Sequence, residues 1–136
     1  MSARQIPWGA APDTQAIEAM ARGAIARLPE AFRHHLDDVV LRVEEFADEA
    51  TIDEMAIDDP FALSGLYRGR PISVKSVDDW GTLPDMIFLY RRPILDEWAE
   101  GEVTLEALVA HVLIHEVGHH FGLSDADMHA LEAAAA

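Results

Sequence analysis

Side chains that could do chemistry are concentrated in residues 115–125, which run His-Glu-Val-Gly-His-His-Phe-Gly-Leu-Ser-Asp. His115 and His119 are four positions apart, and four residues of an α helix turn about 400°, so both imidazoles point to the same side. Imidazoles one turn apart can bind a single zinc ion. Glu116 is too close in the helix to join them as a ligand, but it can accept a proton from the water that a catalytic zinc activates. We therefore interpret Glu116 as catalytic and both histidines as metal ligands.

A third ligand is expected just beyond the second histidine. If the helix continued, Asp125 would lie about 9 Å along the axis from His119 and off its face. Gly122 can adopt a positive φ, end the helix and bring the chain back across its own end. We therefore expect Asp125 to complete the ligand set, because three protein ligands with one open position are typical of catalytic zinc.

Several neighbouring residues leave alternatives open. His111 can be a packed core histidine, an outer partner of the ligand His115, or a ligand itself. Asp127 competes with Asp125 as a ligand, but its spacing from Ser124 suits a helix cap. Glu132 is a further candidate third ligand. We expect surface or structural roles, rather than ligation, for the remaining histidines: His34, His35, His120 and His129. The aromatic residues Tyr67 and Tyr90 are either core-edge side chains or oxyanion donors.

The helix that carries the motif is predicted from apolar spacing. Leu105, Leu108, Val109, Val112, Leu113 and Val117 recur at intervals of three and four residues. Thr104 can cap the start of this helix, and Gly122 can end it. Ser124 can then open a last helix, with Asp127 three residues on. The motif is therefore expected on one long helix followed by a sharp turn.

The rest of the chain supplies a second helix and several strands. Asp13 can cap a helix over residues 14–28, Pro29 begins a break or a short new turn, and a short helix suits residues 51–57. Strands are predicted at residues 39–44, 63–67, 72–74 and 86–90, with a turn at 68–71 and a loop at 81–84. Helices and strands segregate, which favours an α+β fold over a parallel α/β sheet. We expect one domain over residues 1–136, with a small mixed or antiparallel sheet packed on the active-site helix.

Composition excludes several classes of function. The chain has 136 residues and a net charge of −15, from 10 Lys and Arg against 25 Asp and Glu. So acidic a protein is not expected to bind nucleic acid or anionic membranes. The absence of cysteine excludes thiolate metal sites and disulfides. No signal sequence or membrane-spanning run is recognised, so we expect a cytoplasmic, monomeric protein.

Charge is unevenly distributed along the chain. Acidic residues gather in residues 37–60 and 93–136, with a mildly basic stretch between them. The acidic blocks are either solvated faces or surfaces that select basic partners. The basic residues between them could line a cleft and favour acidic substrates.

Three stretches of the sequence resemble a known family. Residues 63–69 (Leu-Ser-Gly-Leu-Tyr-Arg-Gly), 87–93 (Ile-Phe-Leu-Tyr-Arg-Arg-Pro) and 115–125 resemble small bacterial zincin-like metallopeptidases, which have a minimal zincin fold. The last stretch is similar to the extended zinc motif of metzincins, with Asp125 in place of their usual third histidine. Met128 is too close to Asp125 to form the Met-turn of the larger enzymes.

The resemblance implies a zinc-dependent peptidase that acts on a peptide or protein. It implies one zinc ion per chain, held by His115, His119 and Asp125, with Glu116 as general base. It also implies that an edge strand within residues 63–91 holds the extended substrate. The alternative is a non-catalytic zincin-fold module that binds metal and acts in protein–protein interaction.

Overall fold

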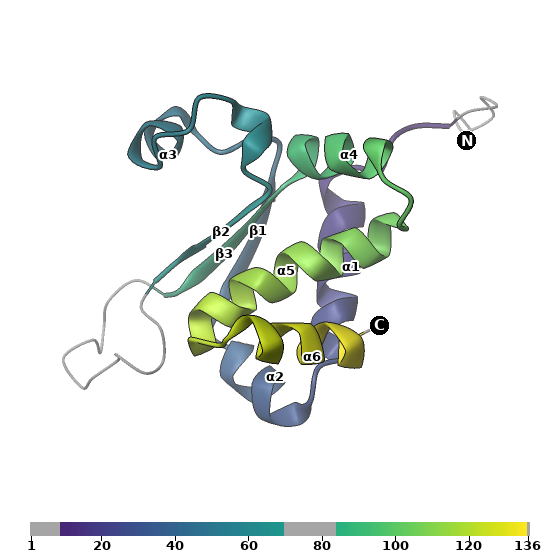
Figure 1. The fold of residues 1–136 in the computed structure, drawn as a ribbon, viewed down its shortest axis with the longest axis vertical. Helices are drawn as coiled ribbons and strands as arrows, with labels where there is room; N and C mark the ends of the chain where they lie inside the picture. Colours follow the sequence, from purple (N-terminus) through teal and green to yellow (C-terminus); the bar gives the residue numbers. More distant parts are fainter. Residues whose placement is uncertain (1–8, 70–83, 136) are drawn as a thin grey trace.

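The computed structural model describes residues 9–69 and 84–135 (Figure 1). The helices in these ranges are α1 (Thr14–Ala26), α2 (Glu30–Leu36), α3 (Glu49–Glu54), the short 3₁₀ helix η2 (Pro60–Ala62), α4 (Arg91–Glu100), α5 (Leu105–Phe121) and α6 (Asp125–Ala135). The strands are β1 (Val40–Glu44), β2 (Gly65–Arg68) and β3 (Met86–Tyr90). None of these helices combines the length and apolar character needed to cross a lipid bilayer.

The three strands form one mixed sheet in the order β1-β3-β2. β1 runs parallel to β3, from Val40 opposite Met86 to Glu44 opposite Tyr90. β2 runs antiparallel to β3, so that Gly65 lies opposite Leu89. The predicted α+β fold with a small sheet is therefore confirmed, and β2 is an edge strand of that sheet.

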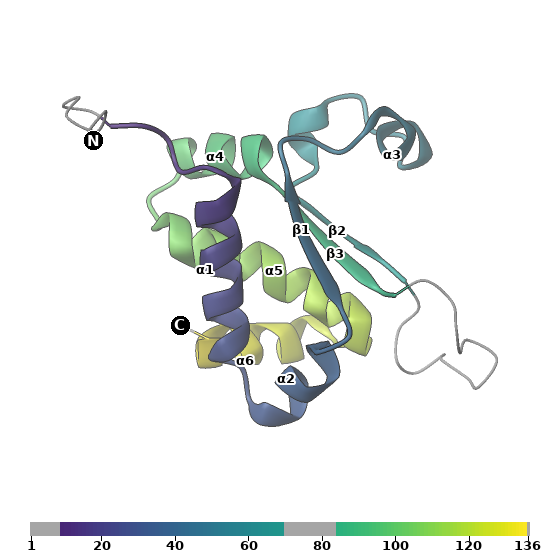
Figure 2. The same cartoon turned by 180° about the vertical axis from the view of Figure 1, so that it is seen from behind.

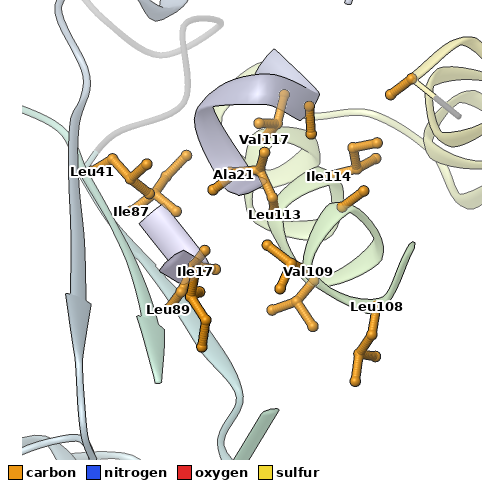
Figure 3. Packing of buried hydrophobic residues seen from close by; sticks show 14 of the residues in the cluster. Ile17, Ala21, Leu41, Ile87, Leu89, Leu108, Val109, Leu113, Ile114 and Val117 are labelled. Atoms are coloured by element: carbon orange, nitrogen blue, oxygen red, sulfur yellow. The ribbon is translucent and has the colours of Figure 1, made fainter. Parts of the chain in front are cut away.

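Helices α1 and α5 pack against one face of the sheet (Figures 1 and 2). Apolar side chains of β3 alternate, so that Ile87 and Leu89 point toward α1 and α5 (Figure 3). They meet a buried cluster that includes Ile17, Ala21, Val109, Leu113 and Val117. The core thus fixes the position of α5 along its axis and its rotation against the sheet.

Helix ends follow the sequence closely. Asp13 accepts a hydrogen bond from the Ala16 backbone N–H, and Thr104 accepts one from that of Ala107. Gly122 has φ 67° and ψ 38°, in the left-handed region expected of a helix-ending glycine. Ser124 Oγ accepts from the Asp127 backbone N–H at 3.2 Å and so caps α6. These local predictions are confirmed.

Two helices were not predicted, and two others differ in their bounds: α1 ends at Ala26 and not at residue 28, and α3 spans Glu49–Glu54 and not 51–57. Where only a break or a short turn was expected after Pro29, α2 forms a helix of seven residues. α4 follows β3 directly, although the sequence analysis assigned no element there. Pro93 lies in the first turn of α4, where its missing N–H costs no helical hydrogen bond. The predicted strand at 72–74 and most of the loop at 81–84 lie outside the described residues, and the single-domain assignment stays a prediction.

Candidate active site

α5 presents the motif residues on two sides. The apolar stripe of α5 is buried in the core, and this orients the rest of the helix. His115 and His119 are exposed one turn apart, while Glu116 is only 8 % exposed. Both imidazoles therefore face solvent, whereas the carboxylate of Glu116 is held inside the protein.

The carboxylate of Glu116 has partners from two elements. Its Oε1 lies 3.2 Å from Nδ1 of His119, in the same helix. It also accepts a hydrogen bond from the backbone N–H of Tyr67 in β2. Burial raises the pKa of Glu116 above its ordinary value, and the neighbouring His119 and the Tyr67 N–H partly oppose this rise. Glu116 is therefore a desolvated carboxylate held between α5 and β2.

Gly65 allows β2 to approach α5 this closely. A Cβ atom at Gly65 would lie 2.8 Å from Cγ1 of Val112 and 3.3 Å from both Cγ and Oε2 of Glu116. Contacts shorter than about 3.5 Å between carbon atoms are repulsive. The absence of a side chain at this position is thus a requirement of the close approach between strand and base.

In the part of the chain that the structure describes, no strand pairs with the outer edge of β2. Ser64 O accepts from the Tyr90 N–H at 2.9 Å, so residues 64, 66 and 68 form the hydrogen-bonded pairs with β3. The backbone groups of Gly65 and Tyr67 therefore point away from β3. One of them, the Tyr67 N–H, is the group that bonds Glu116. Glu116 thus lies directly beside the outer edge of β2.

The two strand tyrosines are integrated into the fold. The Tyr67 hydroxyl donates a hydrogen bond to Oδ2 of Asp85 at 3.0 Å. Burial raises the pKa of Tyr67, and the bond to Asp85 raises it further. Burial raises the pKa of Tyr90 to about 12. The structure thus favours core-edge roles for both rings over oxyanion stabilisation. The sequence analysis did not single out Asp85, which is 7 % exposed and directly precedes β3; its one sequence signal is an acid next to an apolar strand.

The turn after α5 reverses the chain, as expected. The Leu123 N–H bonds Gly118 O at 2.9 Å and the Gly122 N–H bonds His119 O at 3.3 Å, which is a Schellman arrangement. Asp125 then begins α6 and is exposed. Met128 is buried against Gly118, where an added Cβ would overlap Sδ of Met128. This packing sets where α6 lies against the motif helix.

The third ligand is not assembled in the structure. Among the side chains at 9–69 and 84–135, no group of three or more His, Asp or Glu residues is placed to hold a metal ion. Asp125 as third ligand therefore stays a prediction. Glu132, the other candidate, lies 2.8 Å from Nδ1 of His111 through its Oε1.

Other candidate residues have local roles. The ring of His111 lies 4.6 Å, centroid to centroid, from that of His115. The Asp127 N–H serves the α6 cap, and His129 is exposed. His34 and His35 contact each other on α2, while the side chain of His120 lies outside the structural description.

The basic residues of this stretch are engaged in ion pairs where the structure describes them. Arg68 bonds Glu54 at 2.9 Å and Thr51 at 3.0 Å. Arg91 and Arg92 both reach Glu45, at 2.8 and 3.3 Å. The described arginines therefore give no support to a preference for acidic substrates; Arg70 and Lys75 lie outside the described residues.

The donor chemistry of α5 fits zinc. The imidazoles of His115 and His119 are one helical turn apart, which is a spacing at which both can bind a single zinc ion, and both residues are exposed. The contact between Nδ1 of His119 and Glu116 leaves Nε2 of that ring for a metal, in the usual pairing of a ligand histidine with a carboxylate. The residues present therefore suit the metal that the motif implies.

The chain matches the model of one known protein family. No curated protein sequence matches the chain. The family described as zincin-like metallopeptidase matches residues 36–135, which include β1, β2, β3 and the whole of α5. The match covers most of the chain and both elements that hold Glu116. The chain therefore belongs to the zincin-like metallopeptidase family.

Proposed function

We propose that the chain is a zinc-dependent peptidase in which His115, His119 and Asp125 hold one zinc ion and Glu116 is the general base. Membership of the family implies zinc binding and suggests protease activity. Zinc bound by these residues would act as a Lewis acid toward the scissile carbonyl and would acidify water. The substrate in this proposal is an extended peptide or a protein segment.

One observation carries the proposal: a buried carboxylate lies beside the outer edge of β2, which pairs with no other strand in residues 9–69 and 84–135, and it is next to an exposed histidine in α5. Peptidases of extended substrates commonly pair the substrate backbone with the edge strand of a sheet. The N–H and C=O of Gly65 in β2 point to this outer side. A peptide paired there would lie next to Glu116 and to the histidine face of α5.

The chemistry assigned to Glu116 is proton transfer. Its carboxylate takes one proton from the attacking water as the new C–O bond forms at the carbonyl carbon. The same proton then passes to the leaving nitrogen as the C–N bond breaks, so Glu116 ends the cycle ionised. The contacts with His119 and the Tyr67 N–H hold the carboxylate in place for both transfers.

The test is Glu116→Gln, which keeps the shape of the side chain and removes the proton acceptor. We expect this variant to retain zinc and to lose at least about 100-fold in cleavage rate, the lower range for general base catalysis. Cleavage is measured by mass spectrometry of a digested peptide library. Glu106→Gln is the matched control, because it removes an exposed acid from the first turn of the same helix.

The same experiment separates the alternative function. A wild-type protein that binds zinc and cleaves no peptide in a broad library would favour a non-catalytic binding module. Equal cleavage by wild type and Glu116→Gln would refute the assignment of the base.

A further inference from the structure

A path of side-chain contacts joins α6 to the first motif histidine. Oε1 of Glu132 in α6 lies 2.8 Å from Nδ1 of His111 in α5. The ring of His111 in turn lies 4.6 Å from the ring of His115, tilted by 56°. The exposed histidine is thus touched by a ring that is itself fixed from a second helix.

The Glu132–His111 pair is not required to attach α6 to the protein. Met128, Leu131 and Ala135 of α6 are buried, and Met128 packs on Gly118. The side chains of His111 and Glu132 are 44 % and 31 % exposed, so they lie at the rim of this contact. An ion pair or hydrogen bond this exposed adds little to folding stability.

We propose that His111 and Glu132 are positioning residues for His115, an inference that rests on the proposed zinc site. The carboxylate of Glu132 accepts from Nδ1–H of His111 and limits that ring to one orientation. The fixed ring then removes rotamers in which His115 would turn toward His111. A ligand held in this way loses less conformational entropy when it binds metal.

The experiment measures zinc affinity by chelator competition in His111→Ala, Glu132→Ala and the double variant. We expect each single variant to bind zinc about 3-fold more weakly, less than the roughly 10-fold lower limit for hydrogen-bonded partners of metal ligands, because His111 meets His115 through a ring contact. Because Glu132 acts through His111, the double variant should bind no more weakly than His111→Ala alone. Glu132→Gln keeps an oxygen acceptor for His111 and should retain most of the affinity.

Glu106→Ala is the control, since it removes an acid from α5 without touching His111. The metal-free unfolding midpoints of Glu132→Ala and Glu106→Ala should agree. A second readout is histidine ring NMR of the metal-free protein, in which Glu132→Ala should shift the signals of His115, whereas Glu106→Ala should leave them unchanged.

Either of two affinity results would overturn the inference: zinc affinities equal to the control in both single variants, or additive losses in the double variant. Unchanged His115 ring signals in Glu132→Ala would do so as well. Failure of the proposed function looks different, because it shows as absent zinc binding in wild type or as full cleavage by Glu116→Gln.

Discussion

Replacing Gly65 by alanine tests the close approach between β2 and the base. The new Cβ would lie 2.8 Å from Cγ1 of Val112, so the atoms must separate by about 0.7 Å to reach ordinary contact. Val112 is a β-branched residue in a helix and has essentially one rotamer, so the strand has to move rather than the side chain. Glu116 lies in the same path, at 3.3 Å.

The expected cost follows from two opposing effects. Overpacking of this kind destabilises by about 1–3 kcal/mol, whereas replacing glycine at a compatible φ stabilises by about 0.4–1 kcal/mol through the unfolded chain. We expect a net loss of about 1–2 kcal/mol in the free energy of unfolding. Displacement of β2 also lengthens the bond from the Tyr67 N–H to Glu116, so peptide cleavage should fall more than stability alone explains.

Urea unfolding of the metal-free protein measures the stability, and the cleavage rate of a library peptide measures the site. Gly23→Ala is the matched control, because its Cβ would meet only Nη1 of Arg27 at 3.5 Å inside α1. That substitution should stabilise by about 1 kcal/mol. Combining Gly65→Ala with Val112→Ala should relieve the clash and recover part of the cleavage rate. The reasoning is refuted if Gly65→Ala is as stable as wild type and cleaves as fast.

Three further outcomes are expected. Gly118→Ala should destabilise by about 1–3 kcal/mol, because its Cβ would overlap the buried Met128, and the effect should shrink in a Met128→Ala background; urea unfolding measures both. Asp125→Ala should weaken zinc binding in chelator competition. Asp127→Ala should keep zinc and lose only about 0.3–1 kcal/mol in the free energy of unfolding, because the α6 cap uses the backbone N–H of residue 127 and not the side chain. Release of zinc by Asp127→Ala alone would refute the ligand set. Arg68 lowers the pKa of Glu54 from its ordinary value of 4.5, and hydrogen bonds from Thr51 lower the pKa of Asp48 from 3.8. Both ionised carboxylates therefore stabilise the folded protein at a pH above these ordinary values, and this stability is lost as the pH falls through the lower native pKa values. Arg68→Met should flatten this acid loss in melting curves recorded from neutral pH to about pH 3, and an unchanged slope would contradict the Glu54 assignment.

The sequence predicted what local chemistry determines. The caps at Asp13, Thr104 and Ser124 and the turn at Gly122 depend on residues within four positions, and each was predicted. β3 was predicted with its observed bounds because its apolar run is short and dense.

The environment of Glu116 could not be predicted in the same way. Its bond to the Tyr67 N–H and its contact with Gly65 depend on the register of β2 against β3, which no local pattern gives. The bond between Tyr67 and Asp85 has the same origin. α4 was missed because Pro93 resembles a helix breaker unless the start of the helix is already known.

The two halves of the proposed site also differ in when they can exist. His115 and His119 need only one helix to face the same way, whereas the water-poor surroundings of Glu116 need β2 to be docked on α5. A chain in which α5 is formed but β2 is not yet docked would therefore carry the histidine pair beside a hydrated, unanchored carboxylate. Under the proposed mechanism, undocking of β2 should therefore reduce cleavage before it releases metal.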